Sequence, residues 1–352
     1  MGKLRSADDL TRRKFIAGVG VLGTAAIAGS MPALAETELE ETAFEIAAVR
    51  DPQIGTQLIV ADALGLLKEQ GLNISIRWLQ TAADTIPLMA GRAVPLALGN
   101  TFAQVVLGDR IKTVKTISQL ADISGNQGFA LAPGVKLNSP KELEGKRVAF
   151  TQGTPQVLIL TKLAKIYGFD ASKVALVNMN QSEGVVAASK GDVDGLLGWQ
   201  PNLQRLVELG GSLYCTLTTV YASGKPEPMP PGDPLTFQSV LLAQQDWIEN
   251  RPNTLKAFLT ALVKANVVLT TDRGRVFEDI QKVLRIEPKL LALMLDANRF
   301  ELGIPENLAT SYKVLSDWAK SINKISGEVP PSSILSAGIA RSVDPALVTW
   351  RG

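Results

Sequence analysis

The chain has 352 residues, of which 46% are hydrophobic and 20% charged, and its formal net charge is +2. This length is enough for two domains, and the nearly neutral charge gives no basis for nucleic-acid binding. The sequence has no histidine and a single cysteine, Cys215, which excludes histidine-based catalysis, most zinc sites and an intrachain disulfide. We therefore expect no metal and no cofactor. The apolar surroundings of Cys215 indicate a buried thiol rather than a nucleophile.

The first 35 residues have the parts of an export signal. Thr11–Ile16 contains twin arginines, Phe15–Ala28 is an apolar run, and Ala33–Ala35 has the form of a cleavage site. The apolar run is too short to span a bilayer as a stable helix. We predict a twin-arginine signal peptide at residues 1–35, export to the periplasm, and a disordered leader at residues 36–43. The mature chain then carries 31 basic and 32 acidic residues.

Strands and helices alternate in the next stretch of the chain. The expected elements are a strand at 44–49, a helix at 56–70, a strand at 73–79, a helix opened by a capping box at 81–84, a strand at 96–98, a helix at 102–107 and strands at 111–120 and 128–131. This order predicts an α/β protein with a mostly parallel sheet. Ligands of such sheets bind at the carboxyl ends of the strands.

A second alternating run begins with a strand at Arg147–Phe150. The strand leads into Gly153, Thr154 and Pro155, and an apolar-faced helix follows. We expect Thr154 to cap this helix and Pro155 to fit its first turn. A helix start of this kind presents free N–H groups and a positive end, which suits an anion. Plain helix capping is the alternative.

The end of the chain indicates how the two runs are joined. A segment rich in Pro and Gly at residues 224–234 leads to a strand at 237–243, and the remainder is almost wholly helical in pattern. We predict a first lobe made of residues 44–134 and 236–352, and a second lobe, residues 135–235, inserted into it. Two lobes joined by two crossings form a hinged cleft.

Several segments, in order, resemble the periplasmic substrate-binding proteins of ABC transporters, in the nitrate/sulfonate/taurine branch. They are Ala61–Leu72, Leu88–Arg92, Gly99–Thr101, Leu137–Val148, Gly153–Pro155, Gly191–Asp194 and Trp199–Pro201. The resemblance covers residues 44–250 well and implies a two-lobed periplasmic-binding-protein fold of type II. It also implies a monomeric, non-catalytic receptor that delivers a small anion, above all a sulfonate, to an ABC permease in the inner membrane.

The resemblance places the ligand between two helix starts. Asn100 and Thr101 come from the first lobe, and Gly153, Thr154 and Gln156 come from the second. Backbone N–H groups suffice to hold an anionic group, so no ionised base is required. In the second lobe the donors are those of Thr154 and Gln156, because a proline has no N–H.

Further candidates follow from family position. Gln53 is expected to hydrogen-bond the ligand, and Trp199 either walls the ligand or is a core tryptophan. Gln200 stands where the family often has an acidic residue. The ammonium group of an amino-sulfonate usually needs a carboxylate partner, so such a ligand is less favoured here unless Asp84 or Asp51 provides the carboxylate. The sequence leaves open whether Arg50 and Tyr221 reach the cleft.

Two other functions remain open at this point. One is an enzyme of the same fold, although the version that uses a histidine and pyridoxal is disfavoured in a chain without histidine. No Gly-x-Ser-x-Gly motif supports a serine nucleophile. The other is a ligand sensor that docks on a membrane kinase, which the sequence does not separate from a transport receptor.

Overall fold

The computed structural model describes residues 38–221 and 225–352, and its first residues belong to the predicted leader. The predicted signal peptide at residues 1–35 lies outside the described residues. The Glu40 carboxylate accepts hydrogen bonds from the backbone N–H groups of Asn253 (3.1 Å) and Thr254 (2.9 Å). These groups open a helix and have no partner within it, so Glu40 anchors the leader there. The prediction of disorder is therefore wrong for residues 38–43.

Six strands form the first sheet, in the order β13-β4-β12-β3-β1-β2. They are β1 (Ala43–Val49), β2 (Asn73–Leu79), β3 (Leu96–Asn100), β4 (Val114–Asp122), β12 (Gln238–Gln244) and β13 (Arg299–Gly303). Strand β1 pairs parallel with β2 and β3, whereas β12 pairs antiparallel with β3 and β4. Residues of β3, β4 and β12 are buried over nearly their whole length, as expected of a sheet covered on both faces.

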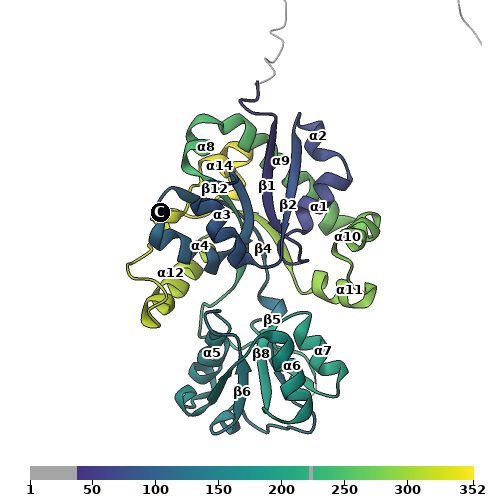
Figure 1. Cartoon of the computed structure of the whole chain (residues 1–352), viewed down its shortest axis with the longest axis vertical. Coiled ribbons are helices and arrows are strands. Elements are labelled where there is room, and N and C mark those ends of the chain that lie inside the picture. Colours follow the sequence, from purple (N-terminus) through teal and green to yellow (C-terminus); the bar gives the residue numbers. More distant parts are fainter. Residues whose placement is uncertain (1–37, 222–224) are drawn as a thin grey trace, which may run out of the picture. The chain divides into compact units, whose positions relative to one another are not determined.

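Helices cover both faces of the first sheet, and together with it they form what we call the first lobe. Figure 1 shows α1 and α10 together on one side of this sheet and α4 and α12 together on the other, and both pairs are in contact. The helices are α1 (Thr56–Ala63), α2 (Leu66–Glu69), α3 (Thr85–Ala90), α4 (Thr101–Arg110), α8 (Gln245–Asn250), α9 (Pro252–Thr271), α10 (Phe277–Leu284), α11 (Pro288–Asp296), α12 (Glu306–Ser321), α13 (Pro331–Ile334) and α14 (Gly338–Val343).

Seven strands form the second sheet, in the order β11-β10-β9-β5-β8-β6-β7. They are β5 (Gln127–Leu131), β6 (Arg147–Phe150), β7 (Ala175–Asn178), β8 (Gly195–Trp199), β9 (Ser212–Thr216), β10 (Thr219–Val220) and β11 (Glu227–Pro228). With α5 (Val157–Tyr167), α6 (Gln181–Lys190) and α7 (Asn202–Glu208) they form the second lobe. In Figure 1, α5 lies on one side of β5 and β8, and α6 and α7 lie on the other.

The sheets correct two expectations. The chain enters the second sheet between the end of β4 at Asp122 and the start of β5 at Gln127, so residues 127–134 do not belong to the first lobe as predicted. The sheets are also mixed rather than mostly parallel. Strands β5 and β12, which follow the two crossings, pair antiparallel with both of their neighbours. Neighbouring strands become parallel when a helix connects them across the sheet. A strand that arrives from the other lobe lacks this connection and can pair in either direction.

Helix α9 is the one described helix that is long and apolar enough to cross a membrane, judged by length and composition alone. Half of its apolar window is buried in the protein, and it contacts α1, α8 and α14. Leu255, Phe258, Leu259 and Leu262 of this helix have no exposed surface. These contacts are those of a core helix of the first lobe.

Candidate functional site

The helix start in the first lobe is capped by its own residues. Strand β3 ends at Asn100, whose side-chain oxygen accepts a hydrogen bond of 2.9 Å from the N–H of Ala103 in α4. The hydroxyl of Thr101, which is 1% exposed, accepts a weak hydrogen bond of 3.5 Å from the N–H of Gln238. The predicted helix opening at this corner is confirmed. Both predicted side chains are engaged within the first lobe.

The helix start in the second lobe differs from the prediction. Helix α5 begins at Val157, and Gln156 precedes it without a side-chain capping bond. Gly153 adopts a φ of +77°, and the hydroxyl of Thr154 donates back to the Thr151 carbonyl over 2.6 Å. The prediction that Thr154 caps the helix is therefore wrong, because a left-handed glycine turn directs this residue toward the preceding loop.

This second start has unused hydrogen-bond donors. The N–H of Thr154 donates weakly to the Thr151 carbonyl over 3.3 Å. Within the described part of the chain, the N–H groups of Gln156 and Val157 donate to no acceptor. Free N–H groups at the positive end of an 11-residue helix are what an anion needs. Of the two donors expected from the sequence, only Gln156 is fully available.

Buried glutamine side chains connect the two lobes beside this helix start. Gln156 Nε2 donates to Gln127 Oε1 over 2.9 Å, and Gln127 Nε2 donates to Gln53 Oε1 over 2.6 Å. Gln53 Nε2 faces the backbone carbonyl of Gln200 at 3.5 Å. The four residues are between 2% and 6% exposed. We call Gln53, Gln127, Gln156 and the Gln200 carbonyl the glutamine relay. It joins the loop after β1 to β5, to the start of α5 and to the end of β8.

The relay leaves one acceptor free. A carbonyl only accepts hydrogen bonds, so the Gln200 carbonyl fixes the orientation of the Gln53 amide and, through it, those of Gln127 and Gln156. In this orientation Gln156 Oε1 is buried and has no hydrogen-bond partner among the described residues. It is one of eleven such side-chain atoms among the described residues, and it belongs to the residue directly before α5. A donor on a ligand at the α5 start could satisfy it.

A partly buried carboxylate supports the relay from the first lobe. Asp51 Oδ1 accepts a hydrogen bond of 2.7 Å from the N–H of Gln53. Burial raises the pKa of the Asp51 carboxyl to about 6, and its hydrogen bonds with Gln53 oppose that rise. Asp51 forms no ion pair with any residue in the described ranges. Asp51 is thus a titratable group in hydrogen-bond contact with the relay.

Two asparagines hold the loop of Gln53 against the first crossing. Asn298 Nδ2 donates to the Pro52 carbonyl over 3.0 Å, and Asn126 Nδ2 donates to Asn298 Oδ1 over 2.7 Å. The carbonyl of Asn126 accepts from the N–H of Gln200 over 2.9 Å. Asn126, Gln127 and Asn298 are absent from the sequence-based candidates. A polar pair at the start of the apolar strand β5 is the one sequence signal that points to the first two.

Of the nine predicted site residues, Gln53, Gln156 and Gln200 meet in the relay, and Gly153 and Thr154 stand in the turn before α5. The Gln200 side chain is engaged elsewhere, because its Oε1 accepts from the N–H of Gln204 in α7 over 3.0 Å. The Asp84 carboxylate accepts from the N–H of Thr81 over 2.9 Å, which confirms the predicted capping box.

Trp199 and Arg50 occupy different surroundings. Trp199 is partly buried and lies opposite Gln127 in the pairing of β8 with β5. The Arg50 guanidinium donates to the Val283 carbonyl in α10 over 2.8 Å. Arg50 is therefore engaged with a C-terminal helix of the first lobe rather than with the relay.

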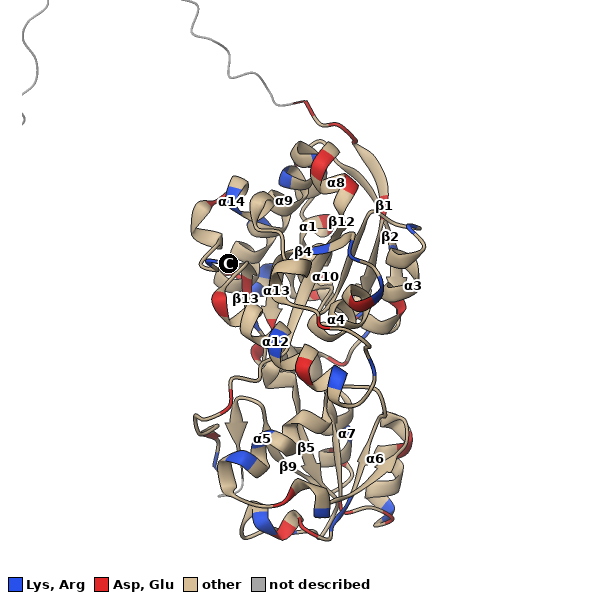
Figure 2. Cartoon of the chain, turned by 90° about the vertical axis from the view of Figure 1, so that its left-hand side faces the viewer, with Lys and Arg blue, Asp and Glu red and all other residues tan. Residues whose placement is uncertain are grey.

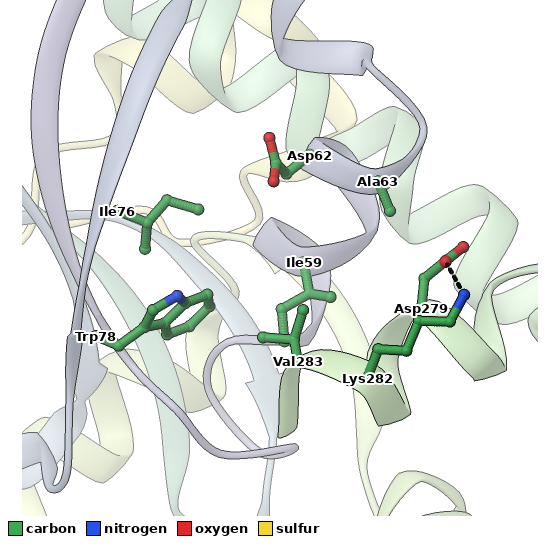
Figure 3. Close-up of a pocket in the computed structure, with 8 residues that line it drawn as sticks. All are labelled: Ile59, Asp62, Ala63, Ile76, Trp78, Asp279, Lys282 and Val283. Atoms are coloured by element: carbon green, nitrogen blue, oxygen red, sulfur yellow. Dashed lines mark hydrogen bonds and ion pairs between the residues drawn. The ribbon is translucent and has the colours of Figure 1, made fainter. Parts of the chain in front are cut away.

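Two pockets lie outside the relay. The pocket in Figure 3, of about 280 Å³, lies within the first lobe and is walled by Trp78, Ile76, Ile59 and Val283, with Asp62 at its edge. A second pocket, of about 300 Å³, lies between α7 and the α10–α11 segment and is lined by Pro201, Arg205, Glu208, Arg285, Ile286, Glu287 and Leu290. None of the nine predicted site residues lines either pocket, although Pro201 follows Gln200 directly.

Charges of both signs are spread over the protein. In the view of Figure 2, Lys and Arg residues are interspersed with Asp and Glu residues over both lobes. Nucleic-acid-binding proteins usually carry a surface stripe of positive charge, and this mixed distribution differs from that pattern. Relay residues are neutral, so any attraction for an anion at this site comes from backbone dipoles and from side chains around it.

Comparisons with known proteins agree with this architecture. A model of the NMT1/THI5-like family matches residues 54–271, and the chain belongs to this family. The taurine-binding periplasmic protein of Escherichia coli (strain K12) is 25% identical over 199 residues, which are 56% of this chain and 58% of that protein. The match thus spans less than two thirds of that relative.

Solved structures share the fold at low sequence identity. A periplasmic sulfonate-binding protein, SsuA, from Methylobacillus flagellatus KT superposes with a TM-score of 0.71 and 15% identity over 88% of this chain and 96% of its own. The desulfurization enzyme DszB superposes with a TM-score of 0.63 and 10% identity over 87% and 99%. The predicted family and the two-lobed α/β fold of periplasmic binding proteins are confirmed. Since a binding protein and an enzyme share this fold, function has to be argued from the site.

Proposed function

We propose that this protein is an exported solute-binding receptor of an ABC importer, which takes up a small organic anion of the sulfonate class. The observation that carries the proposal is the uncapped start of α5. Its free N–H groups lie next to a relay that joins both lobes. A taurine-binding relative and sulfonate-binding structures of the same fold support the ligand class.

Closure of the two lobes on the ligand is the expected mechanism. The N–H groups of Gln156 and Val157 would bind the anion to the second lobe. Contacts of the same ligand with Gln53 or with the α4 start would bind it to the first lobe as well. Only contacts that exist in the closed state shift the equilibrium toward that state. The ligand-bound closed form then docks on a permease in the inner membrane, after export through the predicted twin-arginine signal. Docking on a membrane kinase instead is the alternative for the same closed form.

The site favours a particular kind of anion. Aligned amides and the helix dipole at the α5 start favour a sulfonate head group over a neutral one. The free acceptor Gln156 Oε1 suits a ligand that also carries a hydroxyl or an N–H donor. A ligand with an ammonium group is less favoured, because that group needs a carboxylate or a free acceptor. Position 200 has a glutamine, whose side-chain oxygen already accepts from the N–H of Gln204.

An enzyme of this fold is the second candidate, because DszB shares the architecture. The one cysteine does not support it. Cys215 is fully buried, and burial raises the pKa of its thiol to about 12, so it is not a reactive thiolate at neutral pH. Incubation of a bound ligand with the protein, followed by mass spectrometry, separates the two functions. A receptor returns the ligand unchanged.

A thermal-shift screen of the mature chain, residues 36–352, tests the proposal. The panel comprises ethanesulfonate, taurine, nitrate, bicarbonate, an aromatic sulfonate, an aromatic carboxylate and a pyrimidine. A ligand at ~100 times its Kd stabilises the folded state by about 2.7 kcal/mol. We expect a sulfonate to give the largest shift. Stabilisation by the pyrimidine alone, with no response to any anion, would contradict the proposal.

A further inference from the structure

A lysine of the first lobe lies against the turn before α5 in the second lobe. Lys324 follows α12, and its Nζ stands 3.5 Å from the position that a Cβ on Gly153 would occupy. Helix α12 packs on α4 of the first lobe, whereas Gly153 lies between β6 and α5. A positive side chain from one lobe therefore reaches the helix start of the other.

The turn that carries Lys324 is firmly built. Asn323 adopts a left-handed φ of +57°, and the N–H of Lys324 donates to the Ala319 carbonyl over 2.8 Å. Ile325, the next residue, is 4% exposed. The Asp109 carboxylate of α4 then accepts from the backbone N–H groups at Ser326 (3.1 Å) and Gly327 (2.8 Å). The backbone on both sides of Lys324 is thus fixed to the first lobe.

The charge of Lys324 has no counterpart in the described part of the chain. No ion pair or hydrogen bond to its Nζ is present there, whereas the neighbouring Lys320 pairs with Glu328 at 3.2 Å. Lys324 is exposed to solvent, and its Nζ lies beside the turn at Gly153 that leads into the positive end of α5. Two positive groups that face each other repel, and an anion between them converts the repulsion into attraction from both sides.

A second observation points to a ligand at the same place. Gln156, immediately before α5, is 6% exposed, yet its Oε1 has no partner among the described residues. The free N–H groups and the unsatisfied acceptor thus lie at Gln156 and Val157, and the Lys324 ammonium group lies beside Gly153, three residues before Gln156. Helix capping alone explains none of the three.

We propose that Lys324 supplies the charge that holds the head group of the ligand against the start of α5, and so selects anionic head groups over neutral ones of the same shape. The inference rests on the proposed function and deepens it. A sulfonate or carboxylate gains from both the lysine and the helix start. A sulfonamide or carboxamide of equal size gains little from either.

Calorimetric titration of the mature chain with ethanesulfonate tests this role. Loss of a charge-assisted contact weakens binding by about ten- to hundredfold. We therefore expect Lys324→Gln to raise Kd by at least tenfold and to reduce its dependence on salt, and Lys324→Arg to retain most of the affinity. The matched control is Lys320→Gln, which removes a positive charge one helical turn away and should leave Kd within about twofold.

The alternative role for Lys324 is to neutralise the C-terminus of α12. In that case Lys324→Gln lowers the unfolding temperature of the empty protein and leaves Kd unchanged, which overturns the inference. Equal affinities for ethanesulfonate and ethanesulfonamide in the wild type overturn it as well. If the wild type binds no anion at all, both the proposed function and this inference fail. If it binds and Lys324→Gln binds equally well, only the inference fails.

Discussion

The two helix starts expected to face the ligand are built in different ways. Helix α4 follows strand β3 without a gap, and Asn100 satisfies one of its free N–H groups. Helix α5 follows β6 after a six-residue turn around Gly153, and no side chain caps it. In the first start a side chain of the same lobe caps one N–H group, while in the second no side chain caps any. A capped helix start contributes to the stability of the fold, whereas an uncapped start leaves N–H groups that a ligand can bind.

Blocking the second helix start should have the largest effect. Thr154→Trp places a bulky side chain before α5, and we expect affinity for ethanesulfonate to fall by more than about 100-fold, or about 2.7 kcal/mol. The side chain of Thr154 is only partly buried and bonds locally to Thr151, so the free energy of unfolding of the empty protein should change by less than about 1 kcal/mol. Titration and urea unfolding measure the two quantities.

Thr161→Trp, seven residues further along the chain and inside α5, is the matched control for this substitution. Its hydroxyl, like that of Thr154, bonds only to a nearby backbone carbonyl, here that of Val157. Equal losses of affinity in the two variants would show that the substitution disturbs α5 as a whole rather than its start.

Removing the charge of Asp51 should stabilise the protein in a pH-dependent way. The folded-state pKa is about 6, above the ordinary value of 3.8, so the folded state disfavours the carboxylate. The stability contribution of Asp51 is then greatest below about pH 4 and is lost as the pH rises through 6. Asp51→Asn should raise the free energy of unfolding at pH 7.5 by up to about 3 kcal/mol and leave it unchanged at pH 4. An equal gain at both pH values would contradict this origin.

Truncating the first helix cap should cost stability rather than affinity. Asn100→Ala removes the acceptor for the N–H of Ala103, and loss of such a cap costs about 1 kcal/mol. Asn100→Ser retains a capping oxygen and should recover most of that loss. Urea unfolding of the empty protein measures both. A loss of ethanesulfonate affinity as large as that of Thr154→Trp would mean that the two starts hold the ligand alike, against the asymmetry described above.

A smaller effect should distinguish ligands of the same shape. Isethionate carries a hydroxyl where propanesulfonate carries a methyl group, and Gln156 Oε1 is the unsatisfied acceptor at the α5 start. A net hydrogen bond contributes about 0.5–1.5 kcal/mol, so isethionate should bind roughly three- to tenfold more tightly. Gln156→Met should abolish the difference. Its persistence in that variant would assign the hydroxyl to another acceptor.

Local patterns predicted much of this molecule. The helical pattern predicted after residue 243 holds for α9, and the Thr81–Asp84 motif gave the capping box. The position of the first crossing was not predictable in the same way. The run Gly128–Leu131 indicates a strand, but its sheet is decided by pairing with residues of β8 and β9 that lie 64 to 88 positions further along the chain. Strand β13 was missed because Arg299–Gly303 forms an edge strand in a helical neighbourhood.

The site also contains residues that local patterns indicate and residues that only long-range contacts bring together. Asn100 was expected from the family resemblance to meet the ligand, and in the structure its side chain caps α4. Thr154 was misread because the left-handed turn at Gly153 changes where the helix begins. Gln127 was missed because its partners Gln53 and Gln156 are 74 and 29 residues away. A glutamine on a buried strand has no sequence pattern of its own. Only the packing of the two lobes brings the relay together.

The central claim is that the ligand binds at the uncapped start of α5, and backbone NMR of ¹⁵N-labelled mature chain tests it most directly. On titration with ethanesulfonate, the amide signals of Gln156 and Val157 should shift most, because their N–H groups gain an anionic acceptor. The indole signal of Trp78, in the separate pocket of Figure 3, should stay in place. A shift of the Trp78 indole with unmoved Gln156 and Val157 amides would contradict the account and place the ligand in that pocket instead.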